Sequence, residues 1–175
     1  MKTHHTGTAL AALAGLALLG ACGQGSEPAA TPEAATETVE IVLANGMTPK
    51  AQIELRQGQL KQYGKAFKAM SDQLKSGEPD LAAIQEAATS LQAASVGMET
   101  WFPEGTGPET GIKTDALPAI WETPDDFSDE VANFHAAVGE LVLVTEGGDV
   151  DAIRTAFGTA GGTCKSCHDN YRQDD

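Results

Sequence analysis

Two cysteines lie on the buried stripe predicted for the last helix of this chain, and they restrict the fold more than any other feature. Side chains that step by three and four along one face run through residues 150–171: Val150, Ile153, Phe157, Ala160, Cys164, Cys167 and Tyr171. This spacing predicts an amphipathic helix whose stripe faces a core. A group held by the two cysteines must therefore replace the apolar side chains that this end of the stripe lacks.

The same cysteines belong to the motif Cys164-Lys165-Ser166-Cys167-His168. Two thiols at this spacing can add to the two vinyl groups of one haem, and the adjoining histidine can bind its iron. In a helix, Cys164 and Cys167 lie on adjacent turns of one face, with His168 four residues after Cys164. The motif predicts one covalent haem c with His168 as an axial ligand. Residues 169–175 contain no methionine or histidine, so we expect any sixth ligand to come from upstream.

Other uses of paired cysteines fit the sequence less well. A zinc site would need two more soft ligands, yet the predicted folded region offers no third cysteine and one other histidine, His135. His135 lies away from the centre of its helix's stripe, which favours a boundary residue over a ligand. A thioredoxin-like pair would need a sheet, and no sustained alternation predicts one.

The N-terminal region predicts export. An apolar run too short to be a comfortable membrane span indicates a signal peptide over residues 1–21. The run closes on Leu19-Gly20-Ala21-Cys22, which resembles a bacterial lipobox, and Cys22 would then be acylated as the first mature residue. The alternative is an ordinary signal peptide cut near Ala21. Residues 22–38 have almost no large apolar side chain and are expected to form a disordered tether after the lipid anchor.

Cysteine use and charge limit the partners. With Cys22 on lipid and the other two cysteines on haem, no thiol remains for a disulfide. The net charge of −14 excludes nucleic acid as an expected partner and repels anionic lipid, so membrane attachment should depend on acyl chains. Within residues 50–75 the balance is locally positive, and Lys61, Lys68 and Lys75 share one helix face. That face is either a docking stripe for an acidic partner or second subunit, or a solvated surface.

Three more helices are predicted within the single domain of residues 39–175. The first begins with Thr48 as N-cap and Pro49 as first residue, and stops at Gly77; a second follows Pro79. Residues 101–124, with four prolines and three glycines, form a long connection. The third helix begins near Asp125 or Asp126 and stops at Gly147-Gly148, and Asp149 caps the fourth. The predicted fold is all-α: an antiparallel four-helix bundle with one long crossover loop and haem c on the C-terminal helix.

From about Ile53 to Arg172, the sequence resembles the cytochromes c′, the class II c-type cytochromes. The haem motif and the stretch Cys164 to Arg172 carry most of this resemblance. Further supporting stretches are Arg56-Gln57-Gly58-Gln59-Leu60, Trp101-Phe102-Pro103-Glu104-Gly105-Thr106-Gly107 and Leu117-Pro118-Ala119-Ile120-Trp121.

This resemblance implies roles for several side chains. In the family, the residue matching Leu60 faces the distal side of the haem. A methionine there gives six-coordinate, low-spin iron suited to electron transfer, whereas a leucine leaves five-coordinate iron that a small gas reaches by displacing the side chain. Gln57 or Arg56 would pair with a haem propionate. Arg172 would border the pocket for nitric oxide on the His168 side, although a solvent-exposed arginine is an alternative. Homodimers through the first two helices are also implied.

Function follows from these expectations. Met70 lies too far along its helix to replace Leu60 as a distal residue, and neither Met47 nor Met98 is expected to be well placed. We expect a periplasm-facing protein whose five-coordinate iron binds nitric oxide and carbon monoxide, with nitric oxide binding or detoxification as its role. Without a distal donor, bound dioxygen would gain little stabilisation. The alternative is an electron-transfer cytochrome. A haem enzyme that turns over nitric oxide or peroxide is the third possibility and ranks last, because no acid–base pair near the haem is evident in the sequence.

Overall fold

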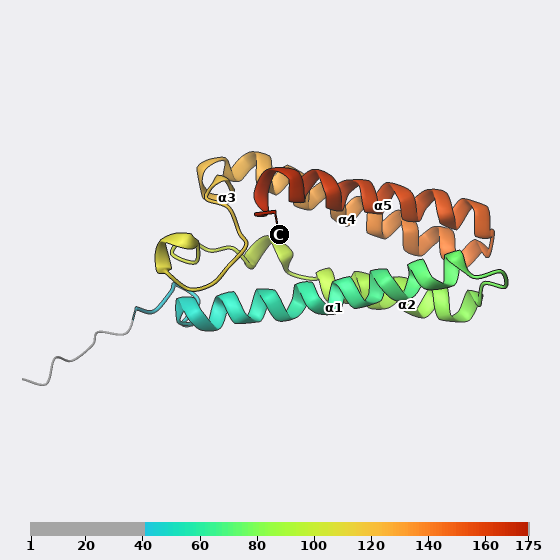
Figure 1. Ribbon diagram of the computed structural model, residues 1–175, viewed down its shortest axis with the longest axis horizontal. Helices are drawn as coiled ribbons and strands as arrows, with labels where there is room; N and C mark the ends of the chain where they lie inside the picture. Colours follow the sequence, from blue (N-terminus) through green and yellow to red (C-terminus); the bar gives the residue numbers. More distant parts are fainter. Residues whose placement is uncertain (1–40, 175) are drawn as a thin grey trace, which may run out of the picture. The chain divides into compact units, whose positions relative to one another are not determined.

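Four long helices form the folded part of the chain in a computed structural model that describes residues 41–174 (Figure 1). They are α1 (Pro49–Lys75), α2 (Leu81–Ser95), α4 (Pro124–Gly147) and α5 (Val150–Tyr171). The segment between α2 and α4 contains three short helical turns: η1 (Met98–Thr100), η2 (Pro108–Thr110) and α3 (Ala119–Glu122). The predicted all-α four-helix bundle with one long crossover is confirmed. Cys22, the predicted signal peptide and the predicted tether lie outside the described residues.

The helix starts follow local capping signals. The Thr48 hydroxyl accepts a hydrogen bond from the backbone of Ala51 at 3.2 Å, and Pro49 occupies the first helical position, where no N–H is needed. Asp149 caps α5 in the same way. Two limits differ slightly from the prediction: α1 ends at Lys75, before Gly77, and α4 begins at Pro124, one residue before Asp125.

The two ends of the bundle differ in how they are filled. α1 packs on α2, α2 on α4, and α4 on α5, whereas α1 and α5 approach each other less closely (Figure 1). The end that contains the α1–α2 and α4–α5 turns, here called the packed end, has a continuous apolar core. Its fully buried side chains include Met70, Ile84, Leu91, Leu141 and Ile153. The stacked rings of Phe67 and Phe157, 4.2 Å apart, join α1 to α5.

The crossover covers the opposite end, here called the pocket end. Its backbone pairs with the end of α5 and the residues just after it: Leu117 donates to the carbonyl of Tyr171 at 2.9 Å, and Gln173 donates to the carbonyl of Asp115 at 2.7 Å. These bonds anchor the end of α5 against the crossover.

Two surface findings bear on partners. Lys61, Lys68 and Lys75 are exposed on α1, and Lys68 pairs with Asp72 at 2.7 Å. Within residues 41–174, no helix is both long enough and apolar enough to cross a bilayer.

Candidate functional site

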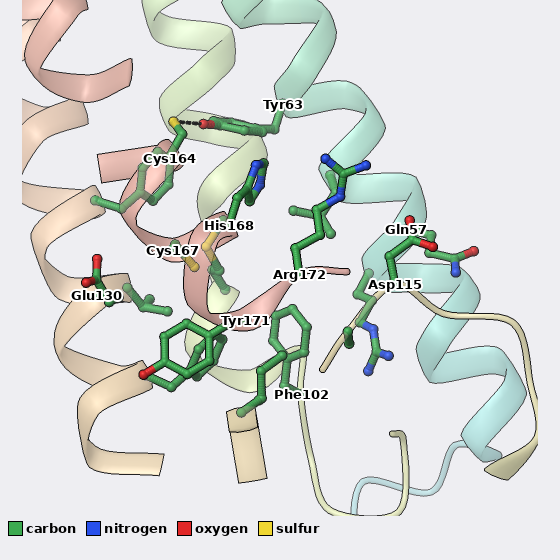
Figure 2. A pocket seen from close by; sticks show the side chains of 18 of the residues that line it. Gln57, Tyr63, Phe102, Asp115, Glu130, Cys164, Cys167, His168, Tyr171 and Arg172 are labelled. Carbon is green, nitrogen blue, oxygen red and sulfur yellow. Dashed lines mark hydrogen bonds between the residues drawn. The ribbon is translucent and has the colours of Figure 1, made fainter. Parts of the chain in front are cut away.

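The pocket end contains a cavity between α1, α4, α5 and the crossover (Figure 2). Its empty volume is about 870 Å³, part of which is open to solvent. All the predicted pocket residues line it, although they come from both ends of the sequence: Arg56, Gln57, Leu60, Cys164, Cys167, His168 and Arg172.

Helix α5 brings the two thiols and the imidazole to one wall of the cavity (Figure 2). Cys164 and Cys167 are half-buried one turn apart, which is the arrangement that the stripe predicted. Between them, the Ser166 hydroxyl donates to Glu130 of α4 at 2.7 Å. This hydrogen bond fixes the motif against the neighbouring helix.

The pocket keeps these groups uncharged. Burial raises the pKa of Cys164, and it raises the pKa of Cys167 to about 11, with Glu130 and Cys164 acting in the same direction. Partial desolvation lowers the pKa of His168, and the positive charge of Arg172 lowers it further, while Asp169 opposes both. A neutral imidazole is the form that binds a metal.

Arg56 is the most unusual group in the cavity wall, because its side chain is 1% exposed yet carries a full charge. Its guanidinium donates to the Thr106 hydroxyl at 2.9 Å, to the Thr106 carbonyl at 2.8 Å and to the Thr114 hydroxyl at 2.8 Å. It also lies 4.8 Å from the centre of the Phe102 ring. All three acceptors are neutral, and among residues 41–174 no carboxylate forms an ion pair with Arg56. Burial lowers the pKa of Arg56 to about 10, partly opposed by Glu109, so it stays cationic at neutral pH.

Helix α1 supplies three more groups to the same wall. The Gln57 amide donates to the Lys113 carbonyl of the crossover at 3.0 Å. Leu60 is half-buried on the cavity, and Tyr63, one turn further on, places its hydroxyl 2.5 Å from Cys164 Sγ. Because these residues share one helix face, the side of the cavity that Leu60 lines also holds a phenol.

The structure corrects two expectations about the cavity. Met98 was expected to be poorly placed, but it lines the cavity and is 9% exposed, because the turn at Gly97 and η1 folds it back against the bundle. Gly97 has φ 78°, a conformation that favours glycine. The expectation that the pocket has no distal donor did not consider Tyr63, which lines the cavity on the same helix as Leu60. The period of three and four places Tyr63 in the core, and that spacing was the available signal.

The crossover contributes Phe102, which no periodic signal marks. Phe102 packs edge to face on Phe127 of α4 at 5.1 Å, and Phe127 packs on Tyr171 of α5 in the same way at 5.1 Å. These three rings form an apolar part of the cavity lining. His135 is not part of the wall; it is half-buried, with Nε2 3.1 Å from the Ser95 carbonyl.

Comparison with known proteins accounts for this combination. A family model described as cytochrome c′ matches residues 51–172. The chain belongs to the cytochrome c′ family. The cytochrome c′ of Allochromatium vinosum is 33% identical over 132 residues, which cover 74% of this chain and 85% of that relative.

Solved structures of cytochromes c′ share the fold. One, described as having an unusual ligand-controlled dimer dissociation, superposes with a TM-score of 0.69 at 31% identity, covering 74% of this chain and 99% of its own. A variant of the Alcaligenes xylosoxidans cytochrome c′ with bound nitric oxide gives a TM-score of 0.66 at 30% identity, covering 73% and 97%. Another variant of that protein is known with bound carbon monoxide.

Cytochromes c′ are periplasmic proteins that carry one covalently bound haem c, and they act in electron transfer or gas binding. The cavity of this chain fits the group on observations of its own. Two thiols and a neutral imidazole share one wall. Across the cavity, Arg56 is a buried cation with only neutral acceptors, which is the partner that an acidic substituent of the haem requires.

Proposed function

We propose that this chain is a periplasm-facing, lipid-anchored cytochrome c′ whose five-coordinate haem iron binds nitric oxide and carbon monoxide. The observation that carries the proposal is the position of Leu60. It lines the same cavity as His168 from a different helix, and it offers the iron no ligand atom. The nitric oxide and carbon monoxide complexes of the Alcaligenes xylosoxidans relative support the choice of ligands.

Each wall of the cavity has a role in holding the haem. Cys164 and Cys167 form the two thioether bonds, and His168 binds the iron. The haem supplies the iron site at which a diatomic gas binds. Arg56 pairs with a propionate and Gln57 lies beside it; we favour Arg56 as the main partner because its charge is buried and forms no ion pair among residues 41–174. Arg172 borders the cavity beside His168, where it favours the neutral imidazole.

The location rests on the sequence before the described residues. A signal peptide over residues 1–21, acylation of Cys22 and a tether over residues 22–38 would hold the domain at the membrane. Replacing Cys22 with serine is expected to release the protein into the soluble periplasmic fraction. Retention of the variant in the membrane fraction would contradict the anchor.

The assembly is proposed to be a homodimer through α1 and α2. A solved relative described by its dimer dissociation supports this state.

Absorption and EPR spectra of the haem-loaded protein test the open iron site. The wild type is expected to be high-spin and five-coordinate, and to take up nitric oxide when reduced. Leu60→Met is expected to give a low-spin, six-coordinate iron that takes up nitric oxide much more slowly, because the thioether occupies the sixth position.

Leu55→Met is the matched control, since Leu55 lies on the same helix, is 45% exposed and does not line the cavity. Its spectrum should equal that of the wild type. An unchanged spectrum for Leu60→Met would show that Leu60 does not face the iron.

Electron transfer is the second candidate function, and the position of Met98 favours it. A thioether on the cavity wall is a possible sixth ligand that would close the iron to gases. A low-spin wild-type spectrum that becomes high-spin in Met98→Leu would establish this alternative. A high-spin wild type whose spectrum is unchanged in Met98→Leu would exclude it.

A further inference from the structure

Tyr63 is the group in the cavity wall that the proposed function leaves unused. It lies on α1 three residues after Leu60, and its hydroxyl reaches Cys164 Sγ at 2.5 Å (Figure 2). Since residues three apart share a helix face, the phenol lies on the side of the cavity where Leu60 would meet a bound gas. This places the phenol hydroxyl on the Leu60 side of the cavity, on the helix face that also carries Gln57.

The ring of Tyr63 is held by its neighbours. Phe134 packs edge to face against it at 5.3 Å, and Phe67 is tilted against it at 6.3 Å. These contacts fix the ring while the hydroxyl can still rotate about its C–O bond. Burial raises the pKa of Tyr63, and the hydrogen bond to Cys164 adds to this effect, so the hydroxyl keeps its proton at physiological pH. The Tyr63 hydroxyl can therefore donate a hydrogen bond throughout the physiological pH range.

Haem attachment changes the hydrogen-bond acceptor that is available to the Tyr63 hydroxyl. In the free thiol, either Tyr63 or Cys164 can donate to the other. Once the sulfur is a thioether it has no hydrogen and is a weak acceptor. The Tyr63 hydroxyl then has to donate to this weak acceptor or to a stronger one within reach. A diatomic ligand whose outer atom carries negative charge is such an acceptor.

We propose that Tyr63 donates a hydrogen bond to a gas ligand bound on the Leu60 side of the haem. This inference rests on the proposed function. It makes Tyr63 a specificity-determining residue, because the donor favours nitric oxide, whose bound outer atom is a better acceptor, over carbon monoxide. In this cavity wall, Leu60 restricts the entry of the gas and Tyr63 slows its dissociation.

Tyr63→Phe tests the donor, because it removes the hydroxyl and keeps the ring that packs on Phe134. In the haem-loaded ferrous protein, the dissociation rate of nitric oxide from the six-coordinate complex, in which His168 stays bound and the gas lies on the Leu60 side, is expected to rise roughly two- to tenfold, the range that one lost hydrogen bond gives. The N–O stretching frequency should shift upward in the infrared spectrum. Carbon monoxide dissociation should change by less than about twofold, because bound carbon monoxide is a poor acceptor.

Thr159→Val is the control, because it removes a hydroxyl from α5 outside the cavity. Thr159 is exposed, and its hydroxyl donates to the Thr155 carbonyl at 3.2 Å. The control should leave both rates and the N–O frequency unchanged. If Tyr63→Phe shows the wild-type dissociation rate of nitric oxide and an unshifted N–O frequency, the proposal for Tyr63 is overturned but the proposed function is not. A wild-type iron that takes up neither gas would overturn it together with the proposed function.

Discussion

Replacing Arg56 with methionine should destabilise the haem-loaded protein by about 2–4 kcal/mol. The guanidinium donates three hydrogen bonds of 2.8–2.9 Å to Thr106 and Thr114, and each bond from a charged donor contributes about 1.5–3 kcal/mol. The three bonds together contribute roughly 4.5–9 kcal/mol. Removing the guanidinium charge from water costs several kcal/mol per ion, and the expected loss is the difference between the two. Methionine preserves the apolar stem but leaves the buried acceptors without a donor.

Urea denaturation followed by far-UV circular dichroism measures this loss. Thr114→Val, which removes one of the three acceptors, should cost about 1–2 kcal/mol. Lys61→Met is the matched control on an exposed position of the same helix, and it should stay within about 0.5 kcal/mol of the wild type. The reduction potential of Arg56→Met should also fall, because removing a cation near the haem favours the ferric state. Equal stabilities for Arg56→Met and Lys61→Met would refute this reasoning.

Two further predictions concern the bundle itself. Asp80→Ala should lower the free energy of unfolding by about 1 kcal/mol, because the Asp80 carboxylate caps α2 by accepting from the backbone of Ala82 and Ala83; thermal unfolding of the haem-loaded variant measures the loss. Leu91→Ala should cost about 2.7–5 kcal/mol in urea denaturation, because Leu91 is 0% exposed at the packed end and truncation leaves a cavity. A cost below about 1 kcal/mol for Leu91→Ala would show that the packed end collapses around the missing side chain.

Local signals account for the parts of the fold that were predicted. Thr48 and Asp149 mark helix starts through bonds to their own neighbours in sequence, and Pro49 marks one by lacking an N–H, so the sequence contains the whole signal. The stripe that includes Cys164 and Cys167 likewise predicted which face of α5 meets the cavity.

Signals of this kind do not reach the crossover. Its helical turns have three or four residues each, which is too short for a period to show. Phe102 lines the cavity through its ring contact with Phe127, and Met98 lines it through the short turn at Gly97 and η1; neither leaves a period in the sequence. Arg56 shows the same limit: the resemblance implied a haem propionate as its partner, but its three acceptors in the chain come from crossover residues that lie far along the sequence.

The contrast between the two ends of the bundle has a consequence for maturation. Side chains alone fill the packed end around Met70, Leu91 and Leu141, so its helices can associate before any cofactor arrives. The pocket end has a cavity where that core would continue. Backbone amides near Cys164 should therefore exchange with solvent faster than those near Leu141 until haem is attached. In this partly folded bundle, Cys164 and Cys167 lie on an accessible face of α5. Covalent attachment of the haem is then the last step of folding.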